Sequence, residues 1–74
     1  KKTTRSHFIL NKSNRIIGEV KNYTGVLSYT NQLRDFVLWA QANGYEMHLY
    51  TNAILTGPLQ QVVDSGIIKL FPLG

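Results

Sequence analysis

The chain has no cysteine, only four acidic residues and no long apolar run. Without cysteine it forms neither disulfides nor thiolate metal sites, which fits a reducing compartment. Its apolar runs are far shorter than the roughly 20 residues of a membrane helix, so we expect no membrane partner. The sequence also shows no Ser/His/Asp triad, phosphate-binding loop or zinc-ligand spacing.

What is present is enough for one small folded domain. The chain has 74 residues, of which 43% are hydrophobic, a usual value for a globular protein. A chain of this length buries only about 60% of the surface that it exposes when unfolded, so its core is small. We expect a single domain over residues 1–74. Because the sequence starts with Lys1-Lys2 rather than Met, we expect it to be a module of a longer polypeptide.

Positive charge is concentrated at the start of the chain. The net charge is +4, and the first 21 residues hold six basic residues against one acid, Glu19. Clustered Lys and Arg attract phosphate backbones with a salt-dependent affinity that does not depend on base sequence. Lys12 and Arg15 are therefore candidate nucleic-acid contacts. Lys1 and Lys2 equally fit a solubilising tail.

One expected strand carries two opposite charges on one face. In Ile16–Asn22, side chains alternate between faces, so Glu19 and Lys21 emerge together and Ile16 and Val20 emerge on the other side. Burial of such a pair is costly unless something uses it. A divalent metal bound to phosphate would use both groups. On an edge strand, the same pair is only a solvated polar face.

The pattern along the chain alternates strands with helices. Turn residues at 11–14 separate two strands of a hairpin, and apolar residues at helical spacing follow an N-cap at Ser28 or Thr30. The expected elements are strands 7–10 and 15–21, a helix ending at Asn43-Gly44, strand 46–50, a helix from Thr56 to Ser65-Gly66, and strand 67–71. This order predicts an α/β fold, β-β-α-β-α-β, with a small mixed four-stranded sheet and two packed helices.

Several segments together resemble a known family. They are Gly18-Glu19-Val20-Lys21-Asn22, Leu27 to Phe36 with Gln32-Leu33-Arg34-Asp35, Ala40 to Gly44, and Thr56 to Gln60. With the order of the elements, they are similar to the PD-(D/E)xK, or restriction-endonuclease-like, nuclease domains at the C-terminus of bacterial polymorphic and contact-dependent toxins. The resemblance implies a restriction-endonuclease-like core and divalent-metal-dependent hydrolysis of phosphodiesters in nucleic acid.

The resemblance also implies roles for individual residues. Glu19 would be a metal ligand and catalytic, Lys21 would orient the water or stabilise charge on the phosphate, and Gln32 would hold Lys21 or the water. Apart from the resemblance, Gln32 reads as an ordinary exposed helix residue. Arg34 either contacts a phosphate or pairs with a nearby acid. Trp39 and the tyrosines either stack on bases or pack in the core and its rim.

The family's acidic residue on the preceding strand is missing. No Asp or Glu occurs before Glu19, and His7 is the nearest polar candidate for that position. The resemblance implies Mg or Mn, whereas His7 as a ligand would favour Zn, Ni or Cu. The gap has three explanations: a natural inactive member, an engineered inactivating change, or a domain boundary that omits part of the site.

Partners and location follow from the resemblance as well. It implies nucleic acid as substrate, DNA in preference to RNA, together with a cognate immunity protein. Delivery as part of a larger bacterial toxin would bring the domain to the cytoplasm of the target cell, in bacterial competition. The alternative function is a catalytically inactive module that binds nucleic acid or a protein. Edge strands and a small core independently favour a homodimer.

Overall fold

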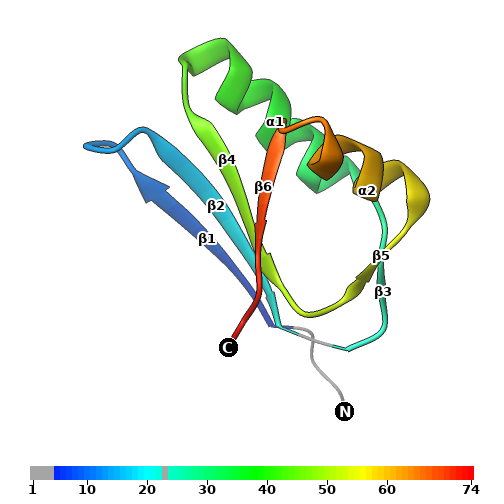
Figure 1. Ribbon diagram of the computed structural model, residues 1–74. Helices are drawn as coiled ribbons and strands as arrows, with labels where there is room; N and C mark the ends of the chain where they lie inside the picture. Colours follow the sequence, from blue (N-terminus) through cyan, green and yellow to red (C-terminus); the bar gives the residue numbers. More distant parts are fainter. Residues whose placement is uncertain (1–4, 23) are drawn as a thin grey trace.

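The computed structural model describes residues 5–22 and 24–74 and contains a four-stranded and a two-stranded sheet with two helices (Figure 1). Lys1, Lys2 and Tyr23 lie outside the described residues. The elements are β1 (Arg5–Asn11), β2 (Ile16–Asn22), β3 (Val26–Leu27), α1 (Asn31–Asn43), β4 (Glu46–Thr51), β5 (Ile54–Leu55), α2 (Gly57–Asp64) and β6 (Ile68–Phe71).

The main sheet is mixed, in the order β1-β2-β4-β6. β1 and β2 form an antiparallel hairpin, and β2, β4 and β6 are parallel because a helix crosses over between each pair. This architecture confirms the predicted four-stranded sheet with two helices. The short parallel pair β3–β5 was not predicted, because two residues per strand are too few to show a period.

The ends of α1 follow the local chemistry of the sequence. Of the two predicted N-caps, Thr30 is the one used: its Oγ1 accepts a hydrogen bond from the backbone N–H of Leu33 at 3.2 Å. Gly44 ends the helix with a φ of 71°, a left-handed conformation that favours glycine. α2 begins with Pro in its first turn after Thr56, as the sequence predicts.

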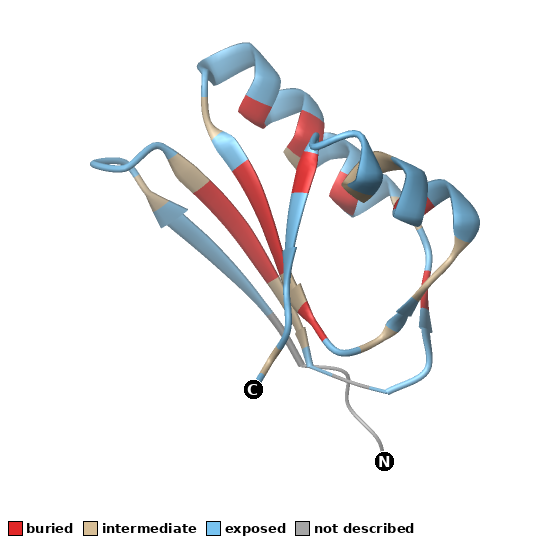
Figure 2. Ribbon diagram, viewed as in Figure 1, coloured by how far each residue is buried: buried red, intermediate tan, exposed pale blue. Residues whose placement is uncertain are grey.

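Both helices cover one face of the main sheet, and the core lies between the helices and this face (Figures 1 and 2). Leu33, Val37 and Ala40 of α1 are buried against the strands, as their spacing predicts. The buried hydrophobic side chains are Ile17, Leu27, Leu33, Val37, Ala40, Met47, Leu49, Leu59 and Ile68.

The other face of the sheet carries an aromatic cluster centred on His48. With the proton on Nε2, His48 donates to Glu46 Oε1 at 3.0 Å, and its Nδ1 accepts from the Tyr50 hydroxyl at 3.2 Å. Tyr50 stacks on Phe71 with ring centroids 5.1 Å apart. The hydrogen bond from His48 and the positive charge of Lys69 lower the pKa of the Glu46 carboxyl. Both ring nitrogens of His48 therefore have hydrogen-bond partners within the sheet.

Candidate catalytic cluster at the junction of β2 and α1

Two elements bring Glu19, Lys21 and Gln32 together. Glu19 and Lys21 lie on the helix-facing side of β2, as strand alternation predicts, and Gln32 lies in the first turn of α1. The Lys21 Nζ donates to Gln32 Oε1 at 2.8 Å and lies 3.5 Å from Glu19 Oε2. A single ammonium group thus joins the strand to the helix.

The charged pair of the cluster is largely withdrawn from water, whereas Gln32 is exposed on the helix. The Glu19 side chain is only 1% exposed and that of Lys21 only 13%. Leu49 lies beside Glu19 on the neighbouring strand β4 and is also buried. Charge interactions are stronger in such a low-dielectric setting than in solvent. This burial excludes the alternative of a solvated polar face for Glu19.

Thr51 fixes the backbone of the cluster, a role that sequence reasoning missed. It lies beside Lys21 on β4, and its hydroxyl donates to the Lys21 carbonyl oxygen at 2.7 Å. The same Oγ1 accepts from the backbone N–H of Ala53 at 3.1 Å. A threonine at the end of a strand gives no signal of this contact, because its partner is 30 residues away in the sequence.

The structure does not bring His7 to Glu19. In the β1–β2 hairpin, His7 pairs with Val20 and Phe8 pairs with Glu19. Paired residues of an antiparallel ladder emerge on the same face, so His7 lies on the face opposite to Glu19. Phe8 takes the position beside the carboxylate. His7 and Glu19 cannot share a metal ion in this arrangement, and the expected softer-metal site has no geometric basis.

The basic candidates do not join the Glu19–Lys21–Gln32 cluster. Lys12 and Arg15 belong to the β1–β2 turn, at the other end of β2 from Lys21, about 20 Å away for strands of seven residues. Arg34 lies over the ring of Tyr29, 4.3 Å from its centroid, and is exposed. Arg34 therefore makes a cation–π contact within the chain rather than joining the cluster.

Of the three side chains in the cluster, Glu19 is the one that offers a carboxylate to a metal. Mg²⁺ is commonly held by one or two carboxylates together with substrate phosphates and water, so Glu19 fits such an ion when nucleic acid is bound. Among residues 5–22 and 24–74, no group of three His, Asp or Glu side chains could hold an ion by itself. The described residues fit a metal completed by the substrate and not a preformed protein cage.

Comparison with protein-family models gives one match over most of the chain. The model described as restriction endonuclease fold toxin 7 matches residues 4–59, from the hairpin to the start of α2. The chain belongs to the restriction endonuclease fold toxins. No curated protein and no solved structure matched it significantly.

Family membership confirms the resemblance and the expected fold. The matched range of this restriction endonuclease fold toxin contains Glu19, Lys21, Gln32 and Thr51. Enzymes of this fold generally use a divalent metal, and toxins of this kind act on nucleic acid and are countered by immunity proteins. Within the described part of the chain, no helix is long and apolar enough to cross a membrane.

Proposed function

We propose that this toxin domain hydrolyses phosphodiester bonds of nucleic acid with a divalent metal at the Glu19–Lys21–Gln32 cluster. The observation that carries the proposal is the Lys21 ammonium group, held 2.8 Å from Gln32 and 3.5 Å from a buried Glu19. The metal is Mg or Mn, since Glu19 offers oxygen ligands.

Each residue of the cluster has a distinct task. Glu19 would hold the ion through its carboxylate oxygens. Lys21 neutralises the negative charge that builds up on the phosphoryl oxygens as water attacks phosphorus and the bond to the leaving oxygen breaks. Gln32 positions Lys21 by accepting one of its three N–H hydrogen bonds. The ion, when bound, polarises a phosphoryl oxygen and lowers the pKa of bound water.

The electrostatics of the fold support phosphate binding at this place. The cluster lies at the first turn of α1, where the helix dipole favours an anion. Lys12 and Arg15 add positive charge at the other end of the hairpin, where a longer substrate would reach them.

A second candidate function is a catalytically inactive module that binds nucleic acid. It is favoured by Phe8, which occupies the position beside Glu19 where a second acid would complete the metal site. Phe8→Asp would place a second carboxylate beside Glu19, where it could share a metal ion, whereas His7→Asp would place it on the other face of the sheet. Comparing these two substitutions therefore separates the two functions.

The test therefore compares two matched substitutions in the hairpin. Wild type, Glu19→Gln, Phe8→Asp and His7→Asp are incubated with supercoiled plasmid and with total RNA, in EDTA and in Mg, Mn, Ni or Zn. We expect cleavage in Mg or Mn by wild type or Phe8→Asp, with His7→Asp no better than wild type. Cleavage that survives Glu19→Gln refutes the site, and no cleavage by any folded version supports the inactive module.

Protein partners are proposed on separate grounds. Membership of a toxin family supports a cognate immunity protein, delivery within a larger toxin and action in the target-cell cytoplasm. The edge strands β1 and β6 support a homodimer formed by strand addition. Light scattering after size-exclusion chromatography tests the dimer, and a monomer at high micromolar concentration refutes it.

A further inference from the structure

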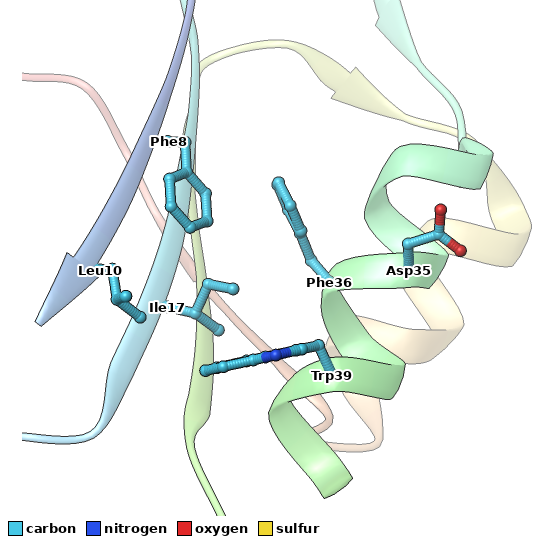
Figure 3. Close-up of a pocket in the computed structure, with 6 residues that line it drawn as sticks. All are labelled: Phe8, Leu10, Ile17, Asp35, Phe36 and Trp39. Carbon is cyan, nitrogen blue, oxygen red and sulfur yellow. The ribbon is translucent and has the colours of Figure 1, made fainter. Parts of the chain in front are cut away.

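A pocket of about 360 Å³ opens between the β1–β2 hairpin and α1 (Figure 3). Its lining residues are Phe8, Leu10, Ile17, Asp35, Phe36 and Trp39. The Asp35 carboxylate points away from the rings, so the walls that face the space are apolar. The volume lies within the range of about 300–1,000 Å³ that is usual for small-molecule sites.

Aromatic rings from both sides form the walls of this pocket. Phe8 of β1 faces Phe36 of α1 with ring centroids 5.3 Å apart, and the indole of Trp39 extends from the helix toward Ile17 (Figure 3). Phe8 of β1 is 55% exposed and Trp39 of α1 is 40% exposed, in contrast to the buried core residues of α1. Aromatic faces that remain open to solvent are available for stacking.

The pocket adjoins the catalytic cluster through one residue on each of its walls. On the strand side, Phe8 pairs directly with Glu19, which places their Cα atoms about 4.5–5.5 Å apart. On the helix side, Phe36 follows Gln32 by four residues and lies beside it on the same face, with Cβ atoms about 5–6 Å apart. The first aromatic side chain on each wall is thus adjacent to a residue of the Glu19–Lys21–Gln32 cluster.

The far end of the pocket leads toward the basic turn of the hairpin. Leu10 is the next helix-facing residue of β1 after Phe8, and Lys12 follows it in the turn. At the end of α1, a guanidinium nitrogen of Arg15 lies 3.6 Å from where a Cβ on Gly44 would stand. From the first turn of α1 toward the hairpin turn, the order is therefore the Glu19–Lys21–Gln32 cluster, the aromatic pocket, and the positive charge of Lys12 and Arg15.

We propose that this pocket stacks one unpaired nucleobase of the strand that is cleaved. The proposal rests on the proposed function, because the phosphate at Lys21 is what brings the base to the pocket. Every base has a flat π face, so stacking on the exposed aromatic surface of this pocket selects an unpaired base without selecting its identity. A base within a duplex would first have to leave its stack, which costs free energy. The preferred substrate is therefore single-stranded.

Trp39 is the only tryptophan, so its fluorescence reports directly on the pocket. The probe is a five-nucleotide deoxyadenosine strand, titrated in EDTA so that binding is measured without cleavage. The matched probe lacks the central base but keeps every phosphate. We expect the complete strand to change Trp39 emission and to bind about 5- to 150-fold more tightly than the abasic strand.

Two variants and one control place the base in the pocket. Phe8→Ala and Phe36→Ala should each lower the affinity for the complete strand by about 5- to 150-fold and leave the abasic strand unaffected. Leu38→Ala is the control, because Leu38 is 64% exposed on the same helix and does not line the pocket. Phe8 is largely exposed, so Phe8→Ala keeps the fold even if Phe36→Ala weakens it.

The result distinguishes this proposal from the proposed function. Equal affinity for complete and abasic strands, or unchanged affinity in Phe8→Ala, overturns the base pocket even when Glu19→Gln abolishes cleavage. Base-dependent binding without cleavage in any metal supports the pocket and refutes the nuclease.

Discussion

Replacing Lys21 with Met would remove the ammonium group that lies 3.5 Å from a carboxylate with only 1% of its side chain exposed. Removal of one partner from a buried ion pair typically costs about 3–5 kcal/mol of unfolding free energy. Lys21 is 13% exposed, so water relieves part of the loss and we expect about 3 kcal/mol. The free energy of unfolding of a domain of 74 residues is roughly 4–11 kcal/mol, so a loss of this size is large.

Glu19→Gln should cost less than Lys21→Met, although both break the same pair. The glutamine keeps the volume of the buried side chain and removes its charge, while Lys21 keeps its bond to Gln32 and its path to water. We expect a loss of about 1 kcal/mol. The double variant should lose about 2 kcal/mol, less than the sum of the single losses, because it leaves no charge in the buried cluster.

Urea denaturation at pH 7, followed by Trp39 fluorescence and by circular dichroism, measures all three variants. With an m-value of about 1 kcal/mol/M, the midpoint should fall by roughly 3 M for Lys21→Met and by roughly 1 M for Glu19→Gln. Lys12→Met is the matched control, because Lys12 is exposed in the turn. Equal losses in the two single variants, with an additive double variant, would refute the coupling of the buried pair.

Three further predictions concern the stability of the domain. Thr51→Val should lower the free energy of unfolding by about 2 kcal/mol in urea melts, since a buried side chain loses two hydrogen bonds. Gly44→Ala should destabilise by more than about 1 kcal/mol because of its φ of 71°, whereas Gly57→Ala, with open space around it, should not. The pKa of Glu46 is lowered by His48, so its stabilisation is present above pH 4.5 and lost on acidification. Thermal melts from pH 6 to pH 3 should show a smaller loss for Glu46→Gln than for wild type.

The order of the elements could be predicted because short-range rules set each of them. The hairpin turn, the cap at Thr30 and the left-handed Gly44 depend on neighbours only a few residues away. The shared face of Glu19 and Lys21 follows from strand alternation alone. The placing of Gln32 beside Lys21 came from the family resemblance, and the structure brings the two side chains into contact.

The interpretation of His7 shows where such rules end. Sequence order made it the nearest polar residue to the vacant position, but the face on which a side chain emerges depends on register, which shifts with the length of the turn. The aromatic pocket and the contact of Thr51 were missed for a similar reason. Each of them joins residues from different elements, far apart in the sequence.

The sequence by itself determined the succession of strands and helices, the charge pair on one face of β2 and the family, because these depend on local periodicity and on residue type. Only the tertiary structure decided that Glu19 is buried, that Phe8 and not His7 lies beside it, and that an open aromatic pocket adjoins it. These properties depend on strand register and on the packing of α1 against the sheet, which no single segment contains.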